Sequence, residues 1–309
     1  RKGDKVLVAI PMNFELYAVM EAIFMTGATA IFLDPWMKGK KMQQVIRQVR
    51  PKLFIAPPKI MALSFLLPAI WSLQKWTIKK LRQSDQKITI ANVDDQDNAL
   101  ITFTSGTSGS PKGASRTFQF LQAQSQTLQS HLEGHDHVDF TNFPIAALVD
   151  FELGHKVIVP NVNLMKIHKA DADKLIRQIL DYKVTRLIVS PSLLSKILEK
   201  LPEKNSIETI ITGGAPISIG LLQKSLSFPH IKFEAIYGST EAEPICLTTF
   251  QAMLQAVDQP LNGVYVGDPV DEIELRVVTL ETPHEINSIE DYQTGGNVGQ
   301  IVVSGPHVN

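Results

Sequence analysis

The chain has 309 residues, of which 44% are hydrophobic and 20% are charged, and its formal net charge is −1. This length is enough to bury a large core in one or two domains, and the near-neutral charge excludes the basic surface typical of nucleic-acid binding. The single cysteine, Cys246, excludes an internal disulfide and a cysteine metal site. We therefore expect a cytoplasmic globular protein, without signal peptide or transmembrane segment, in which Cys246 is a small buried residue.

The first hundred residues alternate between strand-like and helical patterns. Val6–Ile10 and Ala28–Leu33 are apolar runs that flank a helical pattern ending at Gly27, which predicts a βαβ unit in a parallel sheet. A helix over 40–49 and a strand over 53–56 continue this alternation.

The longest apolar stretch is Ile60–Trp76. Ser64, Pro68, Ser72 and Gln74 interrupt it, so it is too short and too polar for a membrane span. We predict a core helix here, and a helix lying on a membrane surface is the alternative.

Residues 99–113 combine an apolar run with a loop of glycines, hydroxyl side chains and one lysine. The apolar run predicts a strand, and a helical pattern resumes near Phe118. Glycines that turn backbone N–H groups inward, hydroxyl donors and Lys112 together favour a phosphate-binding loop between strand and helix. The loop is not a Walker A motif, because Pro111 precedes the lysine and no hydroxyl residue follows it. A plain surface turn is the other alternative.

The alternation resumes after the loop and ends near residue 260. Strands are predicted over 155–159, 187–189, 209–212 and 233–236, and helices over 171–182, 191–201 and 219–226. After Pro260 the pattern changes to strands over 272–278 and 298–304 in a turn-rich background, which favours a β-rich subdomain.

Two polar groups of residues attract attention without a clear function. His131, His135 and His137 lack helical spacing and a fourth ligand, so we predict an exposed turn rather than a zinc site. Asp150 and Glu152 are predicted to cap a helix or face solvent rather than form a catalytic carboxylate pair.

Three motifs resemble those of the AMP-forming adenylating enzymes, the superfamily of acyl-CoA synthetases and of non-ribosomal peptide adenylation domains. They are the loop over 104–113, the Tyr-Gly-Ser-Thr-Glu run over 237–241, and the late strand motif over 295–306, in which Gln300 replaces the usual glutamate. The Gly-Gly-Ala-Pro turn over 213–216 is similar to the family's adenine-flanking turn.

The resemblance implies an α/β fold with two tandem parallel-sheet subdomains, residues 1–98 and 99–260, the second with the nucleotide site. Residues 261–309 would begin a β-rich, barrel-like subdomain, and the whole would form the large N-terminal domain of an acyl-adenylate-forming enzyme. The family's ribose-binding aspartate and its lysine-bearing C-terminal domain would follow Asn309. We therefore expect this chain to be a piece of a longer protein, to bind nucleotide weakly and to make no final product alone.

The resemblance also implies roles for individual residues. Lys112, Thr240 and Glu241 would be catalytic, Tyr237 would offer a ring face to the adenine, and Thr240 would donate to the α-phosphate. Thr104 and Glu241 would hold Mg²⁺, and Phe143 with Pro144 would line the acyl pocket. The nucleotide-binding set would be Thr104, Ser105, Gly106, Thr107, Ser108, Gly109, Lys112, Gly213, Gly214, Ala215, Pro216, Tyr237, Gly238, Ser239 and Thr240.

The implied activity is ATP- and Mg²⁺-dependent activation of a small carboxylic acid as acyl-AMP, with release of pyrophosphate and transfer to coenzyme A or another acceptor. A fatty or hydroxy-fatty acid is favoured, because no acidic residue near Phe143 could clamp an amino group. The middle of the chain is similar to β-lactone synthetases of olefin biosynthesis, so lactone formation from a 3-hydroxy fatty acid is one alternative. A catalytically incomplete acyl- or nucleotide-binding protein is another, and a phosphate-loop NTPase producing ADP is a third. The oligomeric state stays open.

Overall fold

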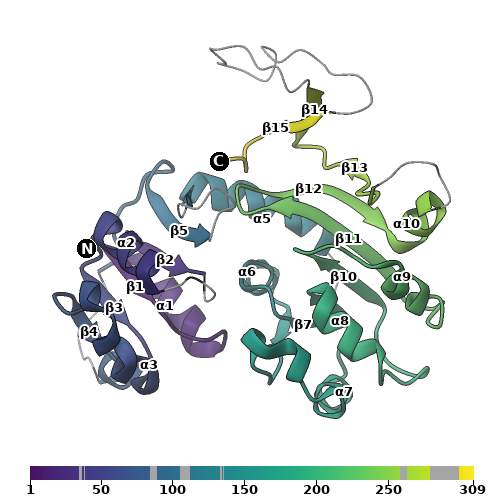
Figure 1. Ribbon diagram of the computed structural model, residues 1–309, viewed down its shortest axis with the longest axis horizontal. Helices are drawn as coiled ribbons and strands as arrows, with labels where there is room; N and C mark the ends of the chain where they lie inside the picture. The colour runs from purple at the N-terminus through teal and green to yellow at the C-terminus, as the bar shows by residue number, and fades with distance from the viewer. Residues whose placement is uncertain are drawn as a thin grey trace. The chain divides into compact units, whose positions relative to one another are not determined.

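The computed structural model describes residues 1–34, 37, 39–83, 89–104, 112–132, 134, 136–257, 263–278 and 299–309. The chain divides into two compact units, Arg1–Gln122 with Asn309, and Ala123–Val308 (Figure 1). Each unit is described below by itself.

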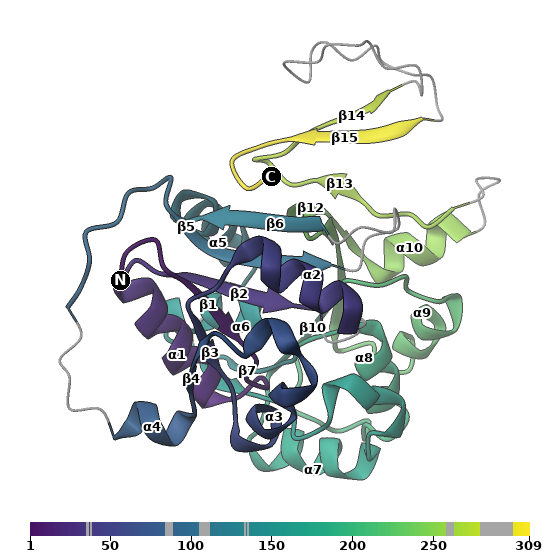
Figure 2. The ribbon, with the colours of Figure 1, turned by 60° about the vertical axis from the view of Figure 1, so that its left-hand side comes forward.

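The first unit is built around a six-stranded sheet with the strand order β4-β3-β1-β2-β5-β6 (Figure 2). All pairings are parallel except that of β5 with β6. The predicted βαβ unit is confirmed, and its apolar strand residues face the core because both sides of a parallel sheet are covered. The elements are β1 (Lys5–Val8), α1 (Phe14–Met25), β2 (Thr29–Leu33), α2 (Gly39–Val49), β3 (Leu53–Ile55), α3 (Pro58–Leu63), the 3₁₀ helices η1 (Ser64–Leu66) and η2 (Pro68–Ile70), β4 (Gln74–Trp76), α4 (Ile78–Arg82), β5 (Asn98–Thr104) and β6 (Lys112–Thr117).

The core helix predicted over Ile60–Trp76 is wrong. This stretch forms the short α3, η1 and η2 followed by the strand β4. Pro68 lacks a backbone N–H and starts a new 3₁₀ turn, and Leu63, Phe65, Leu66 and Trp71 remain exposed. Only Ser64 and Ile70 of the two 3₁₀ helices are buried.

The strand–loop–helix order predicted around Lys112 also needs correction. After β5 and the residues that follow it, the chain returns as β6, antiparallel to β5 with Thr104 opposite Lys112, and only then enters α5 (Phe118–Leu132). Gly113 permits this return, because a Cβ at that position would lie 2.7 Å from the Phe103 ring. A short polar strand of Ser, Arg and Thr residues at a sheet edge carries too little apolar periodicity to be recognised from sequence.

The second unit contains a seven-stranded sheet with the order β13-β12-β11-β10-β9-β7-β8. In the sheet, β8, β7, β9, β10 and β11 lie side by side in this order and pair in parallel. β12 pairs antiparallel with β11, and β13 pairs antiparallel with β12. Its largest core cluster packs the helices α7 to α10 on this sheet (Figure 1). The elements are β7 (Val138–Thr141), α6 (Pro144–Glu152), β8 (Lys156–Ile158), η3 (Leu164–Lys169), α7 (Ala172–Asp181), β9 (Arg186–Val189), α8 (Pro191–Leu198), β10 (Thr209–Gly213), α9 (Ile219–Ser225), β11 (Lys232–Ser239), β12 (Ala242–Thr249), α10 (Phe250–Val257) and β13 (Asp268–Pro269).

A third, two-stranded antiparallel sheet is formed by β14 (Glu274–Val278) and β15 (Gln300–Ser304). It packs through Leu275 and Val303 against a small cluster that contains the buried Cys246. The two compact units meet in sequence between Gln122 and Ala123, whereas the subdomain boundary expected from sequence lies at 98/99. The difference arises because β5 pairs in parallel with β2 and so belongs to the first sheet.

Candidate active site

The Gly213–Pro216 turn follows β10, at the carboxyl end of the second parallel sheet. Gly213 packs so closely on the neighbouring strand that a Cβ there would lie 2.5 Å from the backbone oxygen of Ile236. Gly214 has a φ of +74°, which favours glycine. Both glycines are therefore required by the backbone path, and the turn leaves Gly214, Ala215 and Pro216 exposed at the end of the sheet where ligands bind in open α/β folds.

The Tyr237–Glu241 motif forms the end of a β-hairpin. β11 and β12 pair antiparallel, with Ser239 opposite Ala242, so Thr240 and Glu241 are the two residues of the connecting turn. The register shifts between Tyr237 and Ser239, where the single residue Gly238 of β11 lies opposite three residues of β12, so the bulge is in β12. The Glu241 carboxylate is consequently exposed at the hairpin tip, and Tyr237 keeps an exposed ring surface.

Two buried side chains hold the second strand of this hairpin. Gln124 of α5 donates from Nε2 to the backbone oxygen of Glu243 at 2.8 Å, and His307 Nε2 lies 2.9 Å from the backbone oxygen of Pro244. Both side chains are fully buried. Hydrogen bonds of this kind, formed away from water, fix the hairpin relative to α5 and to the chain's last residues.

A pocket of about 300 Å³ lies between the Gly213–Pro216 turn and β11. Gly214, Ala215 and Pro216 line one part of it and Tyr237 and Gly238 another. The structure thus brings together two predicted nucleotide-binding motifs separated by more than twenty residues. Val264 and Tyr265 also line the pocket, and sequence reasoning missed them because they lie in a turn-rich stretch without periodicity.

The predicted phosphate loop is described only at its ends. Ser105, Gly106, Thr107, Ser108 and Gly109 lie outside the described residues. Thr104 ends β5, and Lys112 begins β6 with its side chain exposed. These residues belong to the first unit, whereas the two motifs that line the pocket belong to the second.

Phe143 and Pro144 start α6 beside the nucleotide turn. Phe143 is the N-cap residue, its backbone N–H donates to Thr141 Oγ1 at 3.0 Å, and Pro144 occupies the first turn. A Cβ on Gly214 would lie 3.5 Å from the Phe143 ring, so the ring faces the Gly213–Pro216 turn. The two predicted acyl-pocket residues and the predicted adenine turn are therefore neighbours within one unit.

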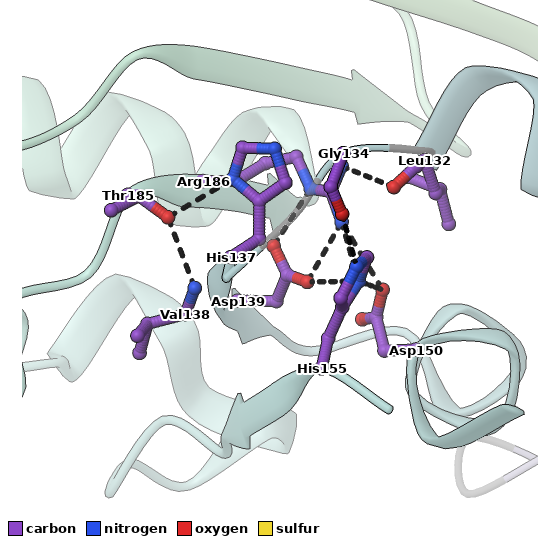
Figure 3. A network of polar contacts seen from close by, with 9 residues as sticks. All are labelled: Leu132, Gly134, His137, Val138, Asp139, Asp150, His155, Thr185 and Arg186. Carbon is purple, nitrogen blue, oxygen red and sulfur yellow. Dashed lines mark hydrogen bonds and ion pairs between the residues drawn. The ribbon is translucent and has the colours of Figure 1, made fainter. Parts of the chain in front are cut away.

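A buried ionic cluster of Asp139, Asp150, His155 and Arg186 lies at the other end of α6 (Figure 3). The Arg186 guanidinium donates to Asp139 through Nε at 2.7 Å and through a terminal nitrogen at 2.8 Å, and it lies 3.5 Å from Asp150 Oδ1. The expectation that Asp150 caps a helix or faces solvent is wrong, because its side chain is fully buried against this cation. Glu152 does lie at the surface, where it accepts from Ser125 Oγ at 2.6 Å.

One contact of His155 places a proton. Nε2 lies 2.9 Å from the Gly134 carbonyl oxygen, which can only accept, so Nε2 donates. Nδ1 lies 3.0 Å from an Arg186 nitrogen and 3.2 Å from Asp139 Oδ2. Burial first, then the Asp139 charge, raises the pKa of Asp150 to about 8, although Arg186 opposes the shift.

Asp139, Asp150 and His155 could ligate a metal by residue type, since their ligand atoms lie within 4.8 Å of one another. The arrangement does not fit one, because the guanidinium already contacts all three side chains at 2.7–3.5 Å. The cluster instead ties α6 to the adjoining strands β7 and β9. The signal that could have found it is the pair of charged residues, Asp139 and Arg186, inside otherwise apolar strands.

The histidine-containing stretch is partly at the surface. His131 is exposed in the last turn of α5, and His135 lies outside the described residues. His137 departs from the expected exposed turn, since it is half-buried with Nδ1 3.2 Å from Thr185 Oγ1. Burial, followed by the Arg186 charge, lowers the pKa of His137.

A family model described as AMP-binding enzyme matches residues 1–309. The chain belongs to this family. Among its curated relatives, an olefin β-lactone synthetase of Stenotrophomonas maltophilia is 26% identical over 326 residues, a match that covers 99% of this AMP-binding chain and 59% of the relative. The chain therefore spans less than two thirds of the length of that relative.

Solved structures support the same fold. O-succinylbenzoate coenzyme A synthetase from Bacillus subtilis, in complex with ATP and magnesium ion, has a TM-score of 0.79 and 19% identity, with 100% of this chain and 62% of that chain covered. A long-chain-fatty-acid-CoA ligase from Archaeoglobus fulgidus has a TM-score of 0.78 and 21% identity, with 100% of this chain and 64% of that chain covered. The expected α/β fold of adenylate-forming enzymes is thereby confirmed. None of the described helices is both long and apolar enough to cross a membrane.

Proposed function

We propose that the protein containing this chain activates a carboxylic acid by ATP-dependent adenylation and releases pyrophosphate. The observation that carries the proposal is the pocket of about 300 Å³ between the Gly213–Pro216 turn and Tyr237, with the exposed Glu241 carboxylate three residues beyond Gly238 on the same hairpin. A pocket of this volume beside an exposed acidic turn suits a nucleobase on one side and a metal-bound polyphosphate on the other.

The described residues fit ATP and Mg²⁺ by chemistry. Exposed glycine and proline residues and the Tyr237 ring can sandwich an adenine, and the Glu241 carboxylate is a hard oxygen ligand suited to Mg²⁺. Magnesium would supply charge neutralisation for the phosphates. Lys112 would contribute a second positive charge, Thr240 would donate to the α-phosphate, and Thr104 would join the metal site.

We further propose a fatty or hydroxy-fatty acid as the substrate, with Phe143 and Pro144 against its acyl chain. The apolar ring of Phe143 beside Gly214 supports this assignment, because it provides contact area without a charged partner for an amino group. Coenzyme A is one candidate acceptor. Closure of a 3-hydroxy acid to a β-lactone is the other, and the similarity to an olefin β-lactone synthetase favours it. The single buried cysteine fits a reducing compartment such as the cytoplasm.

The test is carboxylate-dependent exchange of labelled pyrophosphate into ATP by the complete protein. Saturated and 3-hydroxy fatty acids of increasing length should be compared with amino acids and with succinylbenzoate. Exchange that depends on a fatty acid and yields AMP supports the proposal, and mass analysis of the product after addition of coenzyme A separates the thioester from the lactone. ADP as the product, or exchange with amino acids alone, would overturn it.

A further inference from the structure

Four large apolar side chains in the first unit remain in contact with water. Leu63, Phe65, Leu66 and Trp71 are 58%, 63%, 61% and 60% exposed, and we refer to them as the apolar patch. They come from α3, η1 and the turn after η2, within nine consecutive residues. Single exposed apolar residues are common on protein surfaces, whereas a cluster of this kind marks an interaction site.

The apolar patch is one local surface rather than four separate side chains. The Trp71 indole nitrogen donates to the Phe65 carbonyl oxygen at 3.0 Å, which holds the indole against the turn that carries Phe65 and Leu66. Beneath it, Ile70 is buried in the core of the first sheet, and Met61 and Leu67 pack against that core. The exposed side chains are therefore presented by a backbone that is anchored from below.

The charged residues of the segment that carries the apolar patch have one sign. From Pro35 to Ser84 the sequence contains eleven Lys and Arg residues and no Asp or Glu, although the whole chain has a net charge of −1. Lys75 donates to the Trp71 carbonyl oxygen at 3.2 Å, and the Lys80 amine lies 5.3 Å from the centre of the Trp76 ring, so both cations adjoin the aromatic residues. Lys59 and Lys79 are exposed in the flanking helices α3 and α4.

We propose that the apolar patch, with Lys59, Lys75, Lys79 and Lys80 around it, docks the protein on the surface of an anionic phospholipid bilayer. Phe, Leu and Trp side chains would enter the boundary between head groups and acyl chains, while the lysine amines reach the phosphates. None of the described helices suits a membrane span, so the protein would lie on the bilayer.

A protein partner is less well suited to this surface. Protein–protein interfaces are depleted in lysine and enriched in arginine, whereas the cations beside the apolar patch are lysines. Leucine and phenylalanine in a segment with several lysines and no acidic residue match the composition of interfacial membrane anchors. This inference does not depend on the proposed adenylation, because its readout is binding to lipid.

The experiment is sedimentation of the complete protein with vesicles of phosphatidylcholine alone and with vesicles containing about 30% phosphatidylglycerol, at low and high salt. Two double variants test the two parts of the surface: Phe65→Ser with Trp71→Ser, and Lys79→Gln with Lys80→Gln. Matched controls in the second unit are Leu226→Ser, whose side chain is 66% exposed, and Lys204→Gln with Lys224→Gln. Circular dichroism melting checks that every variant is folded.

We expect binding to anionic vesicles that weakens with salt, and a blue shift of tryptophan emission that Trp71→Phe reduces. The aromatic double variant should lose at least about tenfold in partitioning. The lysine double variant should lose about fivefold per charge on anionic vesicles only, and the controls should bind like the parent. Absence of binding by the folded protein at low salt, as a purely protein-binding surface would give, overturns the proposal. Losses by the controls equal to those of the patch variants overturn it too.

Discussion

The last parallel strand of each large sheet is followed by an antiparallel return strand, but the two sheets differ in their buried cores. The return strand is β6 after β5 in the first unit and β12 after β11 in the second, where β13 pairs beyond β12. A predicted site motif includes residues at each return: Thr104 and Lys112 at the described ends of the 104–113 motif, and the two-residue turn Thr240–Glu241. A parallel strand delivers the chain to the edge where ligands bind, and the antiparallel return of β12 leaves Thr240 and Glu241 there.

The two sheets differ in the side chains that are buried against them. The described core of the first sheet is an apolar cluster, and Arg116 of β6 is the charged side chain that is buried there among the described residues, whereas the second sheet contains the buried ionic cluster of four residues around Arg186. Apolar packing tolerates small adjustments, but buried charges depend on every partner being present. The second unit should therefore be the more sensitive to single substitutions in its interior.

Replacing Arg186 with methionine should have the largest effect. It leaves Asp139 and Asp150 buried without their cation, and we expect a loss of about 3–5 kcal/mol in the free energy of unfolding. Hydrogen exchange should show the loss in β7, α6 and β9. Arg177→Met, at an exposed position of α7, is the matched control. Unchanged exchange in these elements would show that the buried ionic cluster contributes nothing to stability.

Glu241→Gln and Lys112→Gln test whether these two residues take part in the proposed adenylation. Both side chains are exposed, so the unfolding free energy should change by less than about 0.5 kcal/mol. Pyrophosphate exchange should fall by about 10²–10³-fold, which is about 3 kcal/mol of barrier height, since each residue would offset phosphate charge.

For that test, Glu203→Gln and Lys204→Gln, exposed in the loop after α8, are matched controls. If Glu241→Gln exchanged pyrophosphate at the parent rate, its proposed metal role would be wrong. A parent rate for Lys112→Gln would likewise remove the lysine from the proposed site.

Gly213→Ala and Gly113→Ala compare the two sheets at glycines that pack closely on a neighbouring strand. At Gly213 the new Cβ would lie 2.5 Å from a backbone oxygen, whereas at Gly113 it would lie 2.7 Å from the side chain of Phe103. A ring can rotate and a paired strand cannot move alone, so Gly213→Ala should destabilise more, by about 1–3 kcal/mol. Urea unfolding of both variants measures the difference. Gly220→Ala, whose new Cβ would have no neighbouring atom within 4 Å, is the control, and equal losses at 113 and 213 would contradict the comparison.

Asp150→Asn should act through the pH dependence of stability rather than through a fixed loss at every pH. The pKa of Asp150 is about 8 in the folded protein against 3.8 for an ordinary aspartate, so between these values the folded state holds a proton that the unfolded state releases. The stabilisation is complete below pH 3.8 and is lost as the pH rises toward 8, by at most about 1.4 kcal/mol per pH unit.

The asparagine variant should lose this slope. Urea unfolding of parent and variant between about pH 5 and 8 measures it. Asp181→Asn, at an exposed position, serves as the control. Parallel pH profiles for parent and Asp150→Asn would mean that Asp150 is ionised in the folded protein.

The sequence alone determined the α/β alternation, the strands before the two glycine-containing turns, and the family resemblance carried by residues 104–113 and 237–241. These features are local: apolar periodicity and glycine or proline at strand ends express the preferences of neighbouring residues. The predicted site motifs of the second unit lie in such local turns. The resemblance implied a common nucleotide site for the 213–216 turn and Tyr237, and Gly214, Ala215, Pro216 and Tyr237 line one pocket.

Only the tertiary structure decided the burial of Asp150, the return strand β6 and the exposure of Phe65 and Trp71. Asp150 of α6 is buried against Arg186 of β9, thirty-six residues later. β6 pairs with β5, and Ile70 lies in the core while Phe65 is exposed. In each case, groups far apart in the sequence compete for a sheet edge or for a buried position. Local sequence patterns do not predict which group succeeds.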